Sequence, residues 1–170
     1  MDSEQNLLKR IKRSPNSIKF IVSPDKELQL QAVKEIGYSI KYIKNPSIEV
    51  QKVAITQNPY CIEYIQDPIE EMQLLAVSIA PRCFKLIKQP TDKVKEYIKN
   101  YEYNRLEKYK QRYDRIMKLE DNDKTDRLSI LMTKMEKEFN ISALNDKEWN
   151  KNNKEIIELY REVSNSKKFN

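Results

Sequence analysis

Nucleophiles and acid–base groups are scarce in this sequence of 170 residues. There is no histidine, which excludes histidine triads, histidine acid–base pairs and zinc sites that contain histidine. There is one glycine, Gly37, whereas phosphate-cradling loops need several glycines for positive φ angles and close backbone approach. The two cysteines, Cys61 and Cys83, have no histidine to act as their base. These counts exclude nucleophile–histidine hydrolases and glycine-loop nucleotide sites.

One group of aspartates imitates a metal site. Asp121, Asp123 and Asp126 resemble the start of a calcium loop, but the sixth position is Asp126, where glycine is expected. The twelfth position is Met132, where a bidentate glutamate belongs, so we interpret the segment as a polar turn between helices. We therefore predict no catalytic residues, no metal and no cofactor. An enzyme is the least favoured hypothesis.

Basic residues offer a different chemistry, the binding of anions. Four basic residues on one predicted helix are spaced three, four and three residues apart, so they lie on one face and form a basic stripe. An apolar stripe runs beside it and consists of Leu106, Tyr109, Tyr113 and Ile116. Cations beside aromatic rings can grip phosphates and stack bases. We favour the other interpretation, in which the apolar stripe faces a core and the basic stems cover its edge, because nearby acids dilute the positive field. The basic stripe consists of Arg105, Lys108, Arg112 and Arg115.

A repeat of 22 residues organises the first hundred residues. Each unit begins with a proline, which is counted as position 1. The units share glutamate at position 4, glutamine at position 6 and alanine at position 9. Each unit also has a helix-breaking residue at position 14 and apolar residues at positions 17 and 20. A degenerate unit containing Pro15 precedes them. The recurring residues are Pro24, Pro46, Pro68 and Pro90; Glu27, Glu49 and Glu71; Gln29, Gln51 and Gln73; Ala32, Ala54 and Ala76; and Gly37, Pro59 and Pro81.

Each unit predicts a pair of helices. The first begins at the proline, is capped by the preceding Ser23, Asn45 or Asp67, runs about eleven residues and buries positions 5, 9 and 10. The second is short and covers positions 15–21 after the break. Neither helix can bury its face alone, so we expect the units to stack. We expect the position-6 glutamines to form a hydrogen-bond ladder between units, and Cys61 and Cys83, both at position 16, to be packing residues.

The second helices carry the candidate partner surface. Position 15 varies, and the tyrosines and arginine found there are typical interface anchors, so a partner surface is slightly favoured over the alternative of an ordinary solvated ridge. Lysines at positions 18 and 21 make a broken basic ladder beside them. Position 19 is apolar or aromatic in every unit, so we expect those side chains at the edge of the core. The candidate surface residues are Tyr38, Tyr60, Arg82, Lys41, Lys85, Lys44 and Lys88.

The pattern D/N-P-x-x-E-V-Q-x-x-A-V resembles the first helix of HEAT-like repeats, and Asn58-Pro59 with Ile62, Ile65 and Asp67-Pro68 resembles the leucine-rich repeat variant. The resemblance covers residues 2–100, although 22 residues is shorter than the usual repeat of either family, and HEAT-like units commonly carry arginine at position 6. Similar short arrays occur in phage and large-virus proteins. The resemblance implies a short right-handed α-solenoid that serves as a binding scaffold and has no common catalytic site.

The repeat pattern fails in the fourth unit, where position 14 is Tyr103 and no breaker interrupts the helix. We predict one long capping helix over residues 91–119, a turn, a helix over residues 124–138, a connector over 140–144 and a last helix that begins with Asn145 and Glu148 as a capping pair. The chain is thus predicted to be all-α. Residues 1–100 form an α-solenoid of about four repeats, and residues 101–170 form a helical extension.

Charge and composition define the expected partners. The net charge of +6 permits anionic partners without requiring them. The polar start and the lack of a long apolar run predict no secretory signal and no membrane partner, so we expect an intracellular, cytoplasmic protein, in its own cell or in a host. The leading hypothesis is a non-enzymatic binding protein for another protein, in particular a phage- or mobile-element-encoded modulator of a host or defence protein. Nucleic acid is the alternative partner, and the oligomeric state is left open.

Overall fold

The computed structural model describes residues 4–120, 123–141 and 146–167, and every regular element in these ranges is a helix. The fold is therefore all-α, as predicted. The chain divides into two compact units, Met1–Tyr101 and Glu102–Asn170. The first contains α1 (Glu4–Arg13), η1 (Pro15–Phe20), α2 (Lys26–Glu35), η2 (Gly37–Tyr42), α3 (Ile48–Gln57), η3 (Pro59–Tyr64), α4 (Glu70–Ile79), η4 (Pro81–Leu86) and the start of α5 (Asp92–Met117). The second contains the rest of α5, α6 (Lys124–Phe139), α7 (Lys147–Asn152) and α8 (Lys154–Ser166).

Each 22-residue repeat folds as a ten-residue α-helix followed by a six-residue 3₁₀ helix, labelled η. The predicted short second helix is present as a 3₁₀ helix, and it covers positions 14–19 instead of 15–21. An extended residue, such as Asn58 before Pro59, ends the α-helix and starts the 3₁₀ helix. A second extended residue, Ile65, then ends the 3₁₀ helix, and its N–H donates to the carbonyl of Ile62 three residues back. Runs this short tolerate the poorer geometry of 3₁₀ hydrogen bonds.

The predicted caps are also wrong, because the α-helices begin two residues later than expected. Asp25 and Ser47, at position 2, accept hydrogen bonds from the N–H groups of Leu28 and Val50. Asn45 has φ 52° and Asp67 has φ 49°. Both residues therefore turn the chain between units in the left-handed conformation, which asparagine and aspartate tolerate better than most residues.

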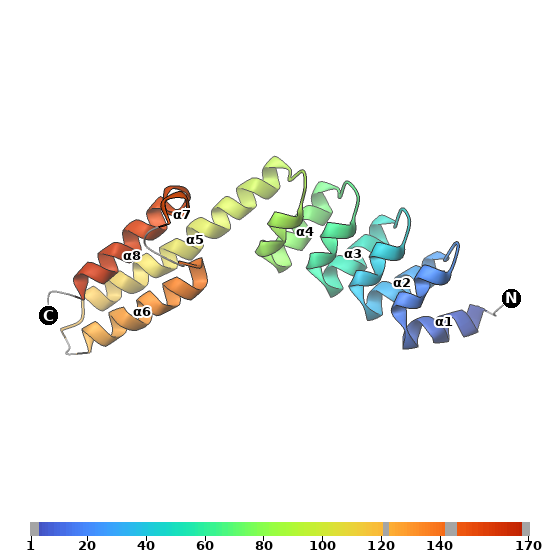
Figure 1. Ribbon diagram of the computed structural model, residues 1–170, viewed down its shortest axis with the longest axis horizontal. Coiled ribbons are helices and arrows are strands. Elements are labelled where there is room, and N and C mark those ends of the chain that lie inside the picture. The colour runs from blue at the N-terminus through green and yellow to red at the C-terminus, as the bar shows by residue number, and fades with distance from the viewer. Residues whose placement is uncertain (1–3, 121–122, 142–145, 168–170) are drawn as a thin grey trace. The chain divides into compact units, whose positions relative to one another are not determined.

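The predicted core positions of the repeats are confirmed. The side chains at positions 5, 9 and 10 are at most 2% exposed in all three complete units. Helices α1 to α4 contact one another in sequence order, and so do η1 to η4, so consecutive units stack (Figure 1). The handedness of this stack stays a prediction. The buried residues at these positions are Leu28, Ala32, Val33, Val50, Ala54, Ile55, Met72, Ala76 and Val77.

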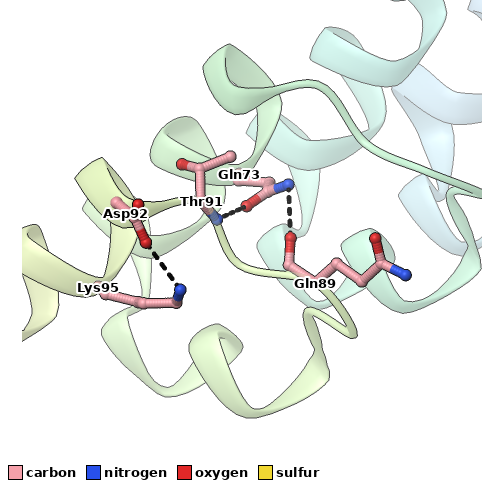
Figure 2. Close-up of polar contacts among 5 residues, drawn as sticks. All are labelled: Gln73, Gln89, Thr91, Asp92 and Lys95. Carbon is pink, nitrogen blue, oxygen red and sulfur yellow. Dashed lines mark hydrogen bonds and ion pairs between the residues drawn. The ribbon is translucent and has the colours of Figure 1, made fainter.

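The position-6 glutamines bond mainly within their own units, which corrects the expected ladder between units. In each unit the side-chain amide nitrogen donates to the carbonyl of the proline at position 1, over 2.8 to 2.9 Å. Gln73 adds two contacts where α4 meets α5 (Figure 2): its Nε2 donates to the Gln89 carbonyl at 3.3 Å, and its Oε1 accepts from the Thr91 N–H at 3.1 Å. At this junction alone, among the described contacts, the glutamine bridges to the next helix.

The second unit packs the C-terminal part of α5 with α6 and α8 around a separate core that contains Leu106, Tyr113, Met135 and Val163. The boundaries of α5 and α6 confirm the predicted helices to within two residues. The last predicted helix is interrupted at Asn153, whose side chain donates to the Trp149 carbonyl, so α7 and α8 are separate helices. The predicted capping residue Asn145 lies outside the described residues, and Asp146 caps α7 by accepting from the Trp149 N–H.

Within the described ranges, no helix combines the length and the apolar character that crossing a membrane requires.

Candidate binding surfaces

The 3₁₀ helices place one row of side chains on the surface of the first unit. Residues three apart eclipse one another in a 3₁₀ helix, so positions 15 and 18 of each unit point the same way. Tyr38 and Lys41 form such a pair on η2, and Arg82 and Lys85 form the equivalent pair on η4; all four side chains are exposed. Tyr60 on η3 is 39% exposed and Tyr38 is 36% exposed. Partial burial raises the pKa of Tyr38, and the neighbouring Cys61 and Tyr64 add to the rise.

The expectation that position-19 side chains lie at the core edge is confirmed for Tyr42 and Leu86, which pack against the core, and is wrong for Phe20 and Tyr64, which extend this row. Phe20 is 72% exposed and Tyr64 is 43% exposed. The Tyr64 ring meets the Tyr38 ring of the preceding unit edge to face, with 5.8 Å between ring centroids. These exposed side chains of η1 to η4 are called the ridge below, and they comprise Lys19, Phe20, Tyr38, Lys41, Tyr60, Tyr64, Arg82 and Lys85.

Lysine ammonium groups lie against several of the rings. Lys19 Nζ is 4.8 Å from the centroid of Phe20 and 5.8 Å from that of Tyr42. Lys41 Nζ is 4.9 Å from the centroid of Tyr42. Such cation–π contacts are worth about 0.5–1 kcal/mol at exposed sites. They hold lysines close to the rings and keep the positive charge on the surface.

The predicted basic residues of the repeats are exposed and, in the part of the chain that the structure describes, belong to no ion pair. Glu63 is the one acid at position 18, and Lys44 and Lys88 lie at position 21, just beyond η2 and η4. The ridge with its flanking lysines is thus positively charged. The residues concerned are Lys41, Lys44, Arg82, Lys85 and Lys88.

Ion pairs between neighbouring units occupy another edge, at the start of the α-helices, and the sequence analysis missed them. Lys26 pairs with Glu49, Lys52 with Glu71 at 3.6 Å, and Lys93 with Glu70 at 2.7 Å. The hydrogen bond and charge of Lys93 lower the pKa of the Glu70 carboxyl, and Glu70 in turn raises the pKa of Lys93. Glu49 and Glu71 hold position 4 and Glu70 holds position 3, and the lysines in the first two turns of the adjacent units were the overlooked signal. These pairs neutralise acids away from the ridge.

The two cysteines are buried free thiols beneath the ridge. Burial raises the pKa of Cys61 to about 12, and the neighbouring Cys83 adds to the rise. Burial likewise raises the pKa of Cys83. The thiolate is the reactive form of cysteine, so this environment favours the packing role.

At pH 8 we expect Cys61 in the folded chain to react with Ellman's reagent at least roughly a thousandfold more slowly than in denaturant. A pKa of about 12 in place of 9.0 lowers the thiolate fraction by that factor. The rate of thiol release in native buffer and in urea checks this. A fast phase of one thiol per folded chain would contradict the burial of both cysteines.

The basic stripe of the second unit does not act as one surface. Arg105 Nε donates to Glu138 Oε1 at 2.9 Å, its Nη2 donates to the Glu138 carbonyl at 2.6 Å, and its guanidinium lies 4.7 Å from the centroid of Phe139. These contacts give Arg105 a structural role between α5 and α6. The Lys108, Arg112 and Arg115 side chains are exposed. The apolar stripe beside them faces the core of this unit, as expected, since Leu106, Tyr113 and Ile116 are buried.

No protein-family model matches this chain, and no curated protein and no solved structure matches it. The resemblance to HEAT-like repeats and to the leucine-rich repeat variant therefore stays a prediction. Function is inferred below from the exposed side chains themselves.

Proposed function

We propose that the chain is a non-enzymatic binding protein whose ridge docks against an acidic surface of another protein. The observation that carries this proposal is the row of half-exposed tyrosines beside cations that lack ion-pair partners in the described part of the chain. Tyrosine and arginine are enriched among the residues that dominate binding energies at protein interfaces. Tyr60 and Arg82, at the same position of consecutive units, are the proposed anchors.

Nucleic acid fits this surface less well. Binding of single strands relies on bases stacking on open aromatic faces. Lys19 and Lys41 lie against the rings of Phe20 and Tyr42, and the Tyr38 and Tyr64 rings contact each other. Glu63 interrupts the positive row that a phosphate backbone would follow. A partner protein with scattered carboxylates needs neither open ring faces nor an unbroken row of positive charge. Tyrosine hydroxyls and arginine can each form hydrogen bonds with its carboxylates.

The cellular location and the biological role of this binding are proposed from the cysteines and from the resemblance to other repeat proteins. Two free cysteines without a disulfide framework favour an intracellular partner. The resemblance to short phage and large-virus repeat arrays is the basis for proposing a modulator of a host or defence protein. That step is an analogy between folds and carries no residue-level support.

Photo-crosslinking from the ridge tests the proposed function. Benzoylphenylalanine in place of Tyr60 is expected to capture one discrete protein from an extract of the source cells, whereas the same probe in place of the exposed Lys34 on α2 captures none. With the captured protein purified, the double variant Tyr60→Ala/Arg82→Ala is expected to weaken binding at least about a hundredfold, since each anchor contributes roughly 2 kcal/mol. Lys34→Ala is the matched control and leaves affinity unchanged.

Two results would contradict this proposal. Equal capture from both probe positions would mean that the ridge is not the binding face. A gel shift of single-stranded nucleic acid at 50 mM salt that collapses at 200 mM would instead favour the alternative partner, because counterion release makes phosphate binding steeply dependent on salt. We expect no such shift through the ridge.

A further inference from the structure

Three arginines meet at a depression in the surface of the second unit. Arg112 and Arg115 come from α5 and Arg127 comes from the first turns of α6. Ile116 and Leu119 complete the lining, and the volume is about 460 Å³. All the lining residues are therefore either cationic or apolar. Arg112 and Arg115 belong to the basic stripe predicted from the sequence, whereas nothing in the sequence indicates that Arg127 joins them from another helix.

Local contacts hold the arginines of this depression in place. Arg112 and Arg115 are three residues apart and share one face of α5. Arg115 Nε donates to the Gln111 carbonyl at 3.2 Å, which holds the guanidinium group close to α5. Lys124 Nζ donates to the Met117 carbonyl at 3.0 Å and so ties the start of α6 to the end of α5. Arg127 follows one turn later on α6 and lines the depression with the two arginines of α5.

The two arginines that α5 contributes to the depression are not neutralised by ion pairs with described residues. Arg112 and Arg115 are exposed and take part in no ion pair among the residues the structure describes. Four acids of this unit, Asp114, Glu155, Glu158 and Glu162, line a separate groove of about 300 Å³ together with Lys110, Tyr113 and Leu159. None of the described residues that line the arginine depression is acidic.

We propose that this arginine depression binds the phosphate groups of a small organic phosphate. The guanidinium group presents a planar fork of donors that matches phosphate oxygens. The guanidinium groups of Arg112 and Arg115, which form no ion pair among the described residues, can each bind one phosphate of a linked pair, which favours two linked phosphates over one. Ile116 and Leu119 offer an apolar wall for an organic substituent. A nucleic-acid backbone would need a longer positive track, and the contact of Arg105 with Glu138 interrupts that track.

Pyrophosphate is the first probe, titrated into the full-length chain by calorimetry at constant ionic strength set with chloride. We expect saturable binding that Arg115→Gln and Arg112→Gln each weaken about tenfold or more, since each removes a charge-assisted hydrogen bond. Arg112→Lys, which keeps the charge but loses the fork, is expected to lie between wild type and Arg112→Gln. Arg161→Gln on α8 is the matched control and changes the affinity less than about twofold. No saturable binding, or an equal loss in Arg161→Gln, would overturn the proposal.

A second readout does not depend on variants. In the ¹⁵N spectrum of the wild-type chain, the Nε–H signals of Arg112 and Arg115 are expected to shift with pyrophosphate while that of Arg161 stays. Shifts of all three signals together would indicate general ion screening and would overturn the site.

Two further probes identify the source of the phosphate. Phenyl phosphate is expected to bind more tightly than inorganic phosphate because of the apolar wall. A single-stranded oligonucleotide that bound more than about tenfold tighter than pyrophosphate would overturn the small-ligand assignment. The ridge belongs to the other unit, so Tyr60→Ala/Arg82→Ala is expected to leave pyrophosphate binding unchanged, and either proposal can fail without the other.

Discussion

Alanine in place of Gly37 is expected to lower the free energy of unfolding by about 3 kcal/mol. Gly37 does not have a positive φ, so the backbone conformation itself accepts alanine. The added Cβ would lie 2.7 Å from the Ala54 carbonyl oxygen, 2.7 Å from Gln57 Oε1 and 3.0 Å from Cys61 Sγ, all in the next unit. The Ala54 oxygen belongs to the α3 backbone and cannot move unless the stacked units separate. The 2.7 Å hydrogen bond from the Gly37 N–H to Gln57 Oε1 would be weakened as well.

Urea unfolding followed by circular dichroism measures this effect, with Gln57→Ala as the control. Gln57→Ala removes the side-chain acceptor but leaves the backbone contact, so its expected cost is about 1 kcal/mol. The double variant Gly37→Ala/Gln57→Ala still meets the Ala54 oxygen and should not regain wild-type stability. At sites without a close neighbour, Gly→Ala stabilises by about 0.4–1 kcal/mol. A stabilising or neutral Gly37→Ala would thus show that η2 does not pack closely on the following unit.

Gln73→Ala is expected to cost about 3 kcal/mol, whereas Gln51→Ala costs about 1 kcal/mol. Gln73 is 4% exposed, and its side chain donates to the Pro68 carbonyl. It also donates to the Gln89 carbonyl and accepts from the Thr91 N–H (Figure 2). Truncation leaves the Thr91 N–H and the Gln89 carbonyl without this partner at the junction of α4 and α5. Gln51 is less buried and is bonded to the Pro46 carbonyl. The two glutamines hold the same repeat position, so Gln51→Ala is a matched control.

Amide hydrogen exchange gives this comparison a local readout. In the wild-type chain the Thr91 N–H is expected to exchange slowly, because Gln73 Oε1 accepts its hydrogen bond. In Gln73→Ala the same amide should exchange much faster, while amides in α2 keep their protection. If Gln73→Ala proved no more destabilising than Gln51→Ala, the bridge between the third unit and α5 would have no energetic role.

The core of the first unit could be predicted from the sequence because the same core positions recur in each repeat. Alanine at position 9 and aliphatic residues at positions 5 and 10 recur at one helical spacing, and all are buried. The 3₁₀ form of the second helix was also encoded but was not recognised. Gly37, Ile40 and Ile43 stand three residues apart, which is the period of a 3₁₀ helix. Over six residues, this pattern differs too little from an α-helical one to decide between them.

Other features could not be read from local sequence. Asparagine and aspartate suit both a helix N-cap and the left-handed conformation, so Asn45 and Asp67 were assigned to the wrong role. The path of the chain between stacked units decides between the two roles. The contact of Arg105 with Glu138 joins residues 33 positions apart, and Arg127 joins Arg112 and Arg115 from another helix. Such contacts depend on how the helices pack, and a single sequence does not record them.

Stacking of consecutive units is the central claim, because the ridge exists only if equivalent 3₁₀ helices lie side by side. Nuclear Overhauser effects between the ring protons of Tyr38 and Tyr64 test it most directly. These rings are 26 residues apart in sequence, and their centroids are 5.8 Å apart. We predict cross-peaks between the two rings in the wild-type chain and their loss in Tyr64→Leu. Cross-peaks from Tyr64 only to residues of its own unit would contradict the stacked arrangement.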